Sequence, residues 1–357
     1  MAGPGLLKKR TIKNDRVTYD WSTNYTINNY SIVFNIGDYK IVTRNYTTIN
    51  GNKLPMQFYV LAADEKYAQH HLEVLEQVVH IREKYFGEYP WVKEKIGIVE
   101  TPHLGMEHQT MNAYGNHFRY YKIGGKDYDG LMSHEFGHEW WGNKVTAKDW
   151  ADYWIHEGIE TFADALDIRD LENEDAYLKV FQQQALYFKN IQPIILGKDI
   201  DEEAAYNGDI YGKGAFFMHT LRYIIGDSIF FPALREFVTD PAYTYDNLVT
   251  TDDVEKFFSK KTGKDLQPLF NMFLRTTDKL EINVKRVPNE GGKTKMDNPD
   301  NTYKISLANI DMDLPLKINT SRGTQTIIAN KKGLNIQSAT LPVIDPDMYY
   351  FSRIVLE

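Results

Sequence analysis

The 357-residue sequence contains no cysteine, so structural disulfides and thiolate metal sites are both excluded. Any metal ion must therefore be bound through histidine and carboxylate side chains. No run approaches the roughly 20 apolar residues that a membrane-spanning helix requires. The opening residues, MAGPGLLKKR, also lack the apolar stretch and small-residue cleavage site of a secretory signal peptide. These absences predict a soluble chain and leave its compartment open: cytoplasmic or, if a leader has been removed, periplasmic or secreted.

Positive charge is scarce relative to negative charge. The 49 aspartate and glutamate residues outnumber the 41 lysine and arginine residues, which gives a formal net charge of -8. This balance provides no basic surface for nucleic acid or anionic lipid. The apolar fraction of 42% is ordinary for a globular protein and allows a substantial core. We therefore expect a folded protein that binds no nucleic acid.

Hydrophobic patterns change character along the chain. Residues 24–62 contain alternating apolar and polar stretches, which predict antiparallel strands. From Asp64 to Phe86 apolar residues recur at intervals of three and four, which predicts a surface helix that Gly87 ends. IGIVE, at residues 96–100, predicts a short buried strand.

Helical patterns dominate between about residues 128 and 273, and strand patterns return after about Leu280. We therefore predict an α+β fold with a mainly helical centre. The expected domains are a residual β segment at 1–63, a mainly helical domain at 64–278 and a small β-sandwich at 279–357.

The run LMSHEFGHEWWGN contains two histidines four residues apart. On a helix, His134 and His138 would lie on one face with Cβ atoms about 6 Å apart, so that both imidazoles can bind one zinc ion. Glu135 would project near the open side of that metal, where it can take a proton from a bound water. Because H-E-x-x-H arises by chance in about two of a hundred such chains, a third ligand is required.

Glu157 is the candidate for that ligand, since eighteen residues separate it from His138. Two antiparallel helices joined by a loop would bring its carboxylate to the metal and leave the fourth position for water. Asp164 lies seven residues further along the same helical face, where it is either a hydrogen-bond partner of a ligating imidazole or a solvated acid. The alternative to a metal site is an ordinary helix pair with surface charges.

These motifs resemble the zinc signature of the gluzincin aminopeptidases, the aminopeptidase N and leukotriene hydrolase family. In that family H-E-x-x-H is followed, after eighteen residues, by Glu and then Gly. Upstream, LGMEHQT resembles the family's Gly-x-Met-Glu-Asn strand, which implies that Gly105, Met106 and Glu107 bind substrate, with Glu107 at the free α-amine. Downstream, YGKG resembles Tyr-x-Lys-Gly, which implies that Tyr211 steadies the tetrahedral intermediate; Tyr206 falls where relatives carry a second tyrosine.

The resemblance implies a thermolysin-like zinc peptidase domain that holds one zinc ion. It implies a metallo-aminopeptidase that hydrolyses the N-terminal residue from peptides with a free N-terminus, with Glu135 as general base. Relatives carry a larger N-terminal β-domain, and long members carry a C-terminal helical domain, for both of which this sequence has little or no counterpart. His108 stands where the family's upstream motif has Asn.

Two other functions are compatible with the sequence. A thermolysin-like endopeptidase would result if the shorter chain left the cleft open at both ends. A catalytically weak truncated core, or a peptide-binding remnant, would hold zinc and ligand without useful turnover. No residue pattern indicates a side-chain preference or an oligomeric state.

Overall fold

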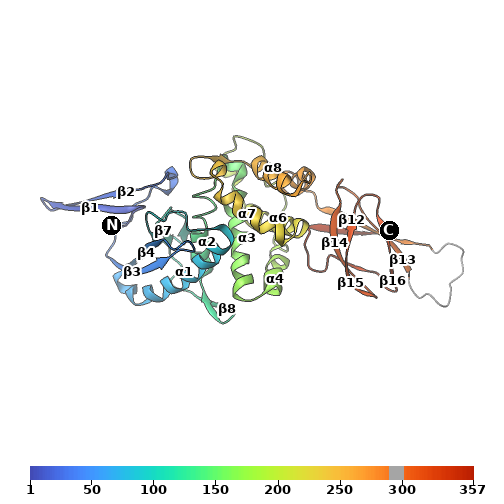
Figure 1. Cartoon of the computed structure of the whole chain (residues 1–357), viewed down its shortest axis with the longest axis horizontal. Helices are drawn as coiled ribbons and strands as arrows, with labels where there is room; N and C mark the ends of the chain where they lie inside the picture. The colour runs from blue at the N-terminus through green and yellow to red at the C-terminus, as the bar shows by residue number, and fades with distance from the viewer. Residues whose placement is uncertain (289–300) are drawn as a thin grey trace.

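The computed structural model describes residues 1–288 and 301–357. The molecule is elongated, with the N-terminal strands at one end, helices in the middle and the C-terminal strands at the other end (Figure 1). Helices and strands thus occupy largely separate stretches of the chain, and the predicted α+β class is confirmed. Within the described residues, no helix has both the length and the apolar character that crossing a membrane requires.

The chain begins with an antiparallel hairpin of β1 (Leu6–Lys13) and β2 (Arg16–Ser22), which the sequence analysis did not predict. Asn14 and Asp15 form its turn with positive φ angles of 47° and 58°. Two-residue turns of this kind suit the right-handed twist of a hairpin. Apart from glycine, Asn and Asp are the residues that best tolerate positive φ angles.

A five-stranded sheet follows, in the order β3-β4-β5-β7-β6. Its pairs are antiparallel at β3–β4 and β6–β7 and parallel at β4–β5 and β5–β7. The strands are β3 (Tyr39–Thr47), β4 (Lys53–Leu61), β5 (Ile96–Glu100), β6 (Gly105–Met106) and β7 (Asn112–Tyr114). Since β4 pairs with β5, the sheet continues across the predicted domain limit after residue 63.

The first part of the predicted strand region is wrong. Residues 29–31 form a 3₁₀-helix, η1 (Asn29–Ser31), and the described residues between 24 and 38 contain no regular strand. The alternating apolar side chains here, Ile32, Phe34 and Ile36, are 67%, 68% and 77% exposed. Alternation predicts a strand only where one face is buried, and these side chains have no facing layer in the structure.

The predicted surface helix is confirmed as α1 (Glu65–Phe86), after which Gly87 takes a positive φ of 83°. Its apolar face packs on β3 and β4. The other helices are α2 (Gly130–Gly137), α3 (Trp154–Leu171), α4 (Glu174–Gln184), α5 (Glu202–Ala205), α6 (Asp209–Ile225), α7 (Asp227–Thr239), α8 (Thr251–Thr262) and α9 (Gln267–Phe270).

Short elements connect these helices: the 3₁₀-helices η2 (Ala62–Asp64), η3 (Trp150–Asp152) and η4 (Pro241–Tyr243), and the π-helical turn η5 (Asn271–Arg275). Two small sheets accompany them, antiparallel β8 (Tyr121–Ile123) with β9 (Lys126–Tyr128) and parallel β10 (Thr146–Ala147) with β11 (Leu248–Val249).

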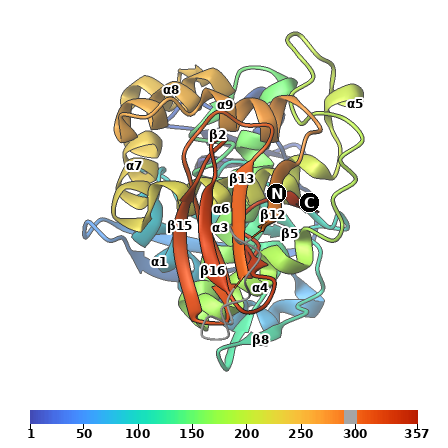
Figure 2. The ribbon, with the colours of Figure 1, turned by 90° about the vertical axis from the view of Figure 1, so that its right-hand side faces the viewer.

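The C-terminal strands form two sheets, in the orders β16-β13-β12-β18 and β15-β14-β17. They comprise β12 (Leu280–Val287), β13 (Asn301–Leu307), β14 (Leu314–Thr320), β15 (Gly323–Ala329), β16 (Leu334–Ser338), β17 (Val343–Ile344) and β18 (Ser352–Leu356). Seen from their side, these strands stand in front of α3 and α6 (Figure 2). Tyr223 of α6 stacks on Tyr349 with ring centroids 3.7 Å apart, which joins the two regions.

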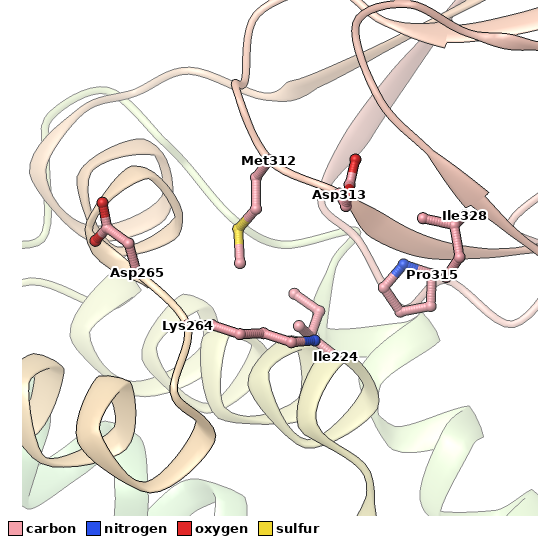
Figure 3. Close-up of a pocket in the computed structure, with 7 residues that line it drawn as sticks. All are labelled: Ile224, Lys264, Asp265, Met312, Asp313, Pro315 and Ile328. Carbon is pink, nitrogen blue, oxygen red and sulfur yellow. The ribbon is translucent and has the colours of Figure 1, made fainter.

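A cavity of about 500 Å³ lies at this junction (Figure 3). Met312 points into it, and the side chain of Lys264 extends along its floor toward Ile224. It contains none of the histidines or carboxylates of the predicted metal site. The cavity therefore belongs to the contact between the helices and the C-terminal strands.

Two buried imidazoles make the fold sensitive to acid. Burial, assisted by neighbouring positive groups, lowers the pKa of His71 and of His219 to about 3. Since an exposed histidine in the unfolded chain has a pKa near 6.5, the unfolded chain takes up these protons first as pH falls. The stability they contribute is complete above pH 6.5 and declines from there toward pH 3, by about 2 kcal/mol per histidine at pH 5.

We therefore expect the free energy of unfolding to fall between pH 7 and pH 5, and His219→Phe to reduce that slope by about one proton. Urea unfolding at several pH values measures the slope directly. His80→Gln, at an exposed position of α1, is the matched control and should leave the slope unchanged. An unaltered slope in His219→Phe would contradict the assignment.

Candidate active site

The predicted metal ligands come from two helices that pack closely against each other. His134 lies in α2, His138 caps its end, and Glu157 lies in the first turn of α3. Gly137 permits this approach, because a Cβ atom there would lie 1.9 Å from Oε1 of Glu160. A larger residue at Gly137 would push α2 away from α3 and separate the ligands.

The three candidate ligand atoms converge on one point. The Nε2 atoms of His134 and His138 are 3.3 Å apart, and they lie 3.3 and 3.4 Å from Oε2 of Glu157. Tetrahedral bonds of about 2.0–2.1 Å separate neighbouring ligand atoms by about 3.3 Å, so this spacing fits a single ion. The chain can hold one metal ion here, through two imidazoles and one carboxylate.

The other ring nitrogens of both histidines are already engaged. Nδ1 of His138 lies 2.8 Å from the Trp141 carbonyl, and Nδ1 of His134 lies 2.9 Å from Oδ2 of Asp164. A carbonyl can only accept, so Nδ1 of His138 carries a proton, and Nε2 is the nitrogen that can bind a metal. Asp164 lies in contact with the ring of His134, which corresponds to the first of the two alternatives that the sequence left open for this residue.

Glu157 is prepared for a cation. Burial acts to raise the pKa of its carboxyl, but His138 and His134 beside it outweigh burial and hold that pKa well below its usual range. The carboxylate is therefore ionised at neutral pH, as a metal ligand must be.

Beneath the ligands lies a buried charge cluster that the sequence analysis missed. Arg82 of α1 is fully buried, and its guanidinium lies 2.7 Å from Glu160, 2.8 Å from Asp164 and 3.1 Å from Asp167. Because Asp164 contacts both Arg82 and His134, the guanidinium fixes the carboxylate that orients the imidazole. The sequence did contain a signal for this cluster, because Arg82 falls among the apolar positions of α1. Arginine is rarely buried unless it is paired with an acidic group.

Strand β6 brings the upstream motif alongside the ligands. Carboxylate oxygens of Glu107 and Glu135 and a ring nitrogen of His138 lie within 4.8 Å of one another. Gly105 leaves the room for Glu135, since a Cβ atom there would lie 2.4 Å from its Oε1. Burial raises the pKa of Glu135 to about 7, which suits a group that exchanges protons near neutral pH. Met106 lines an adjoining cavity of about 660 Å³.

The two predicted tyrosines stand on another side of the cluster. The Tyr206 hydroxyl donates to Oε1 of Glu157 at 3.2 Å and is hydrogen-bonded to the Tyr211 hydroxyl. The Tyr211 ring stacks on His134, with ring centroids 6.0 Å apart. α6 approaches α3 closely here, because a Cβ atom on Gly158 would lie 2.7 Å from the Ile210 carbonyl oxygen. All the predicted site residues thus lie around one centre.

Residues 70–273, more than half of the chain, match the sequence model of the peptidase family M1 domain. The chain belongs to peptidase family M1. The resemblance stated from the motifs is therefore confirmed for the family.

Curated relatives of this family M1 chain are distant and longer. It is 22% identical to mitochondrial aminopeptidase 2 of Saccharomyces cerevisiae over 96% of its own length and 37% of that relative. It is 24% identical to aminopeptidase N of Caulobacter vibrioides over 71% of its length and 31% of that relative. The chain thus spans well under half of these two proteins.

Solved structures show the same fold. A complex of Legionella pneumophila aminopeptidase A with aspartic acid matches 100% of this chain and 43% of that chain, with a TM-score of 0.78 and 19% identity. The M1 zinc metallopeptidase of Deinococcus radiodurans matches 76% of this chain and 60% of that chain, with a TM-score of 0.66 and 20% identity.

The contact between Asp164 and His134 leads to a testable expectation. Asp164→Asn should weaken Zn²⁺ affinity about 10- to 100-fold, because the neutral amide supports the imidazole less well than the carboxylate. Competition against a fluorescent zinc chelator at pH 7.5 measures the affinity. Asp175→Asn, at an exposed position in the first turn of α4, is the control. Equal affinities for both variants would show that Asp164 does not support the ligand.

Proposed function

We propose that this chain is a zinc-dependent aminopeptidase that hydrolyses the N-terminal residue from peptides. The observation that carries the proposal is the convergence of His134, His138 and Glu157 on one point, with Glu135 and the buried carboxylate of Glu107 beside it. Membership of family M1, and relatives named as aminopeptidases, support the same function.

The proposed domain arrangement follows from the sheets. We infer that the thermolysin-like catalytic domain includes β3 and β4, since both belong to the sheet that carries β6 into the site. The domain at residues 279–357 is proposed to be a small β-sandwich formed by the two C-terminal sheets.

His134, His138 and Glu157 would hold zinc, which would supply a Lewis acid and make water at the site more acidic. We assign Glu135 to take the proton from the attacking water, and the proximity of its carboxylate to the candidate ligand His138 supports this role. It then delivers this proton to the leaving amine nitrogen as the peptide bond breaks. Burial acts to raise the pKa of this carboxyl, which favours holding the proton until the amine nitrogen accepts it.

Tyr211 is assigned to the developing oxyanion. Burial and nearby Glu157 raise the pKa of its hydroxyl well above the usual range, so that it remains a hydrogen-bond donor. As the carbonyl oxygen of the substrate gains negative charge, this hydroxyl donates to it. Tyr206 contacts both Tyr211 and Glu157 and so holds the donor at the cluster.

Glu107 is assigned to the substrate's α-ammonium group. It is only 5% exposed and lies beside Glu135, so that an ammonium bound to it places the first peptide bond at the centre. Gly105 and Met106 form the strand along which the substrate backbone would lie. Restriction to the first bond follows from this anchor, because an internal segment has no ammonium to offer.

Removing the proton acceptor should abolish turnover without removing the metal. Glu135→Gln is expected to lower kcat at least about 100-fold, and Tyr211→Phe about 100- to 1000-fold, since each loses one transition-state interaction. Hydrolysis of aminoacyl arylamides measures the rate, and zinc content by elemental analysis provides the control, which should match the wild type. Full activity in Glu135→Gln would contradict its role as general base.

Peptides that differ only at their N-terminus test the anchor. The wild type should hydrolyse a free peptide and leave its N-acetylated form intact, and Glu107→Gln should raise KM for the free peptide. Mass spectrometry of the products identifies the bond cleaved. Internal cleavage of the acetylated peptide would instead indicate an endopeptidase, and zinc binding without turnover would indicate a peptide-binding remnant.

A further inference from the structure

We propose that Tyr30 is a further substrate-binding residue whose hydroxyl contacts the substrate's α-ammonium group together with Glu107. The inference rests on the proposed aminopeptidase function and adds a residue from outside the helical region. Tyr30 lies in η1 (Asn29–Ser31), the segment before the five-stranded sheet. None of the motifs in the sequence includes it.

The segment around Tyr30 is fixed to the loop that follows the ligating histidines. Before Tyr30, Nδ2 of Asn28 donates to the Gly142 carbonyl at 3.2 Å and to the Thr146 hydroxyl at 3.1 Å. After it, the hydroxyl of Ser31, which is fully buried, donates to Oδ1 of Asn143 at 3.1 Å. Contacts on both sides therefore hold the backbone of Tyr30 in place.

The same loop connects this segment with the proposed amine site. Asn143, which accepts from Ser31, donates through Nδ2 to the backbone carbonyl of Glu107 at 2.7 Å. The segment that carries Tyr30 and the strand that leads to Glu107 are thus held to one another through a single amide side chain. Protein groups alone make this connection.

The hydroxyl of Tyr30 faces the carboxylate of Glu107 and the hydroxyl of Tyr153. Tyr30 and Tyr153 also line the cavity of about 660 Å³ that includes Met106 and His156. The hydroxyl is buried, and within the described part of the chain it forms no hydrogen bond of regular geometry. Its interactions with Glu107 and Tyr153 leave lone-pair capacity on the same oxygen, which a ligand group in the adjoining cavity can contact.

A protonated amine has the chemistry to bind a carboxylate and a phenol oxygen that lie side by side. It carries three N–H donors, and a single carboxylate in a buried site does not satisfy all of them. A phenol hydroxyl can donate to Glu107 and at the same time accept from the ammonium. Burial and the charge of Glu107 raise the pKa of Tyr30 well above its usual range, so the phenol stays neutral and keeps both abilities.

A role in binding the ammonium and a role in packing predict different effects when the hydroxyl of Tyr30 is removed. A phenol that only fills space would be replaced by phenylalanine with little effect on any ligand. If the phenol binds the ammonium, its removal should weaken the affinity of ligands that carry a free amine and of no others. The contrast between a free amine and its acetylated form is therefore the decisive measurement.

Tyr30→Phe is the variant that removes only the hydroxyl. We expect KM for an aminoacyl arylamide to rise about tenfold with kcat within about twofold, because the lost contact is made in the bound ground state as well as in the transition state. Competitive inhibition by L-leucinamide should weaken about tenfold. The weak inhibition expected from N-acetyl-L-leucinamide should be the same in the wild type and the variant.

The matched control is Tyr25→Phe in the same N-terminal segment. The Tyr25 hydroxyl accepts from the Lys93 backbone N–H at 3.3 Å, and its ring packs against Trp91, away from the proposed amine site. This control should leave KM and inhibition unchanged. Tyr30→His, whose ring retains a hydrogen-bonding nitrogen, should recover part of the affinity that Tyr30→Phe loses.

The outcomes separate the inference from the function on which it rests. Unchanged KM and unchanged L-leucinamide inhibition in Tyr30→Phe would overturn the role of Tyr30 while the aminopeptidase function stands. Equal losses for the free and acetylated inhibitors would also overturn it, because the effect would then be structural. If the wild type itself binds both inhibitors alike, the anchor at Glu107 fails and the role of Tyr30 fails with it.

Discussion

The site depends on the close contact between α2 and α3. Two imidazoles on one helix can meet a carboxylate on the next only if the backbones approach closely, and Gly137 against Glu160 makes this possible. That contact buries several carboxylates, which are unfavourable away from water unless they are paired. Arg82, reaching in from α1, supplies the pairing and joins a third helix to the arrangement. The metal site therefore rests on a charge cluster as much as on its own ligands.

The surroundings of the ligands are acidic. Glu107, Glu135 and Glu157 lie in one small region, and Asp164 and Glu160 lie just behind it. Like charges at such separations repel one another, and burial adds to the cost of ionising each of them. A divalent ion and a substrate ammonium would both relieve this repulsion. The same electrostatic feature thus favours the two cations that the proposed reaction brings together.

Segments on both sides of the boundary between the N-terminal strands and the helical region surround the candidate site. β3 and β4 pair into the sheet that presents β6 to the site, and η1 is held on the loop after His138. The match to family M1 begins at residue 70, after these elements. Residues outside the region that carries the family signature therefore contribute to the wall of the cleft.

The sequence alone predicted the candidate ligand set, suggested Glu135 as the general base and indicated a mainly helical centre. The spacing of His134, His138 and Glu157 is a local property of two helices, and strong helical periodicity predicts α1 within a few residues of its observed bounds. The hairpin turn at Asn14 and Asp15 was not predicted. The alternating apolar residues after Ser31 were wrongly predicted as a strand, because periodicity does not show whether one face of a segment is buried. Only the tertiary structure placed Arg82 beneath Asp164 and the hydroxyl of Tyr30 beside Glu107. Both contacts join residues tens of positions apart, and no spacing rule within one segment determines which distant side chains will share a buried charge.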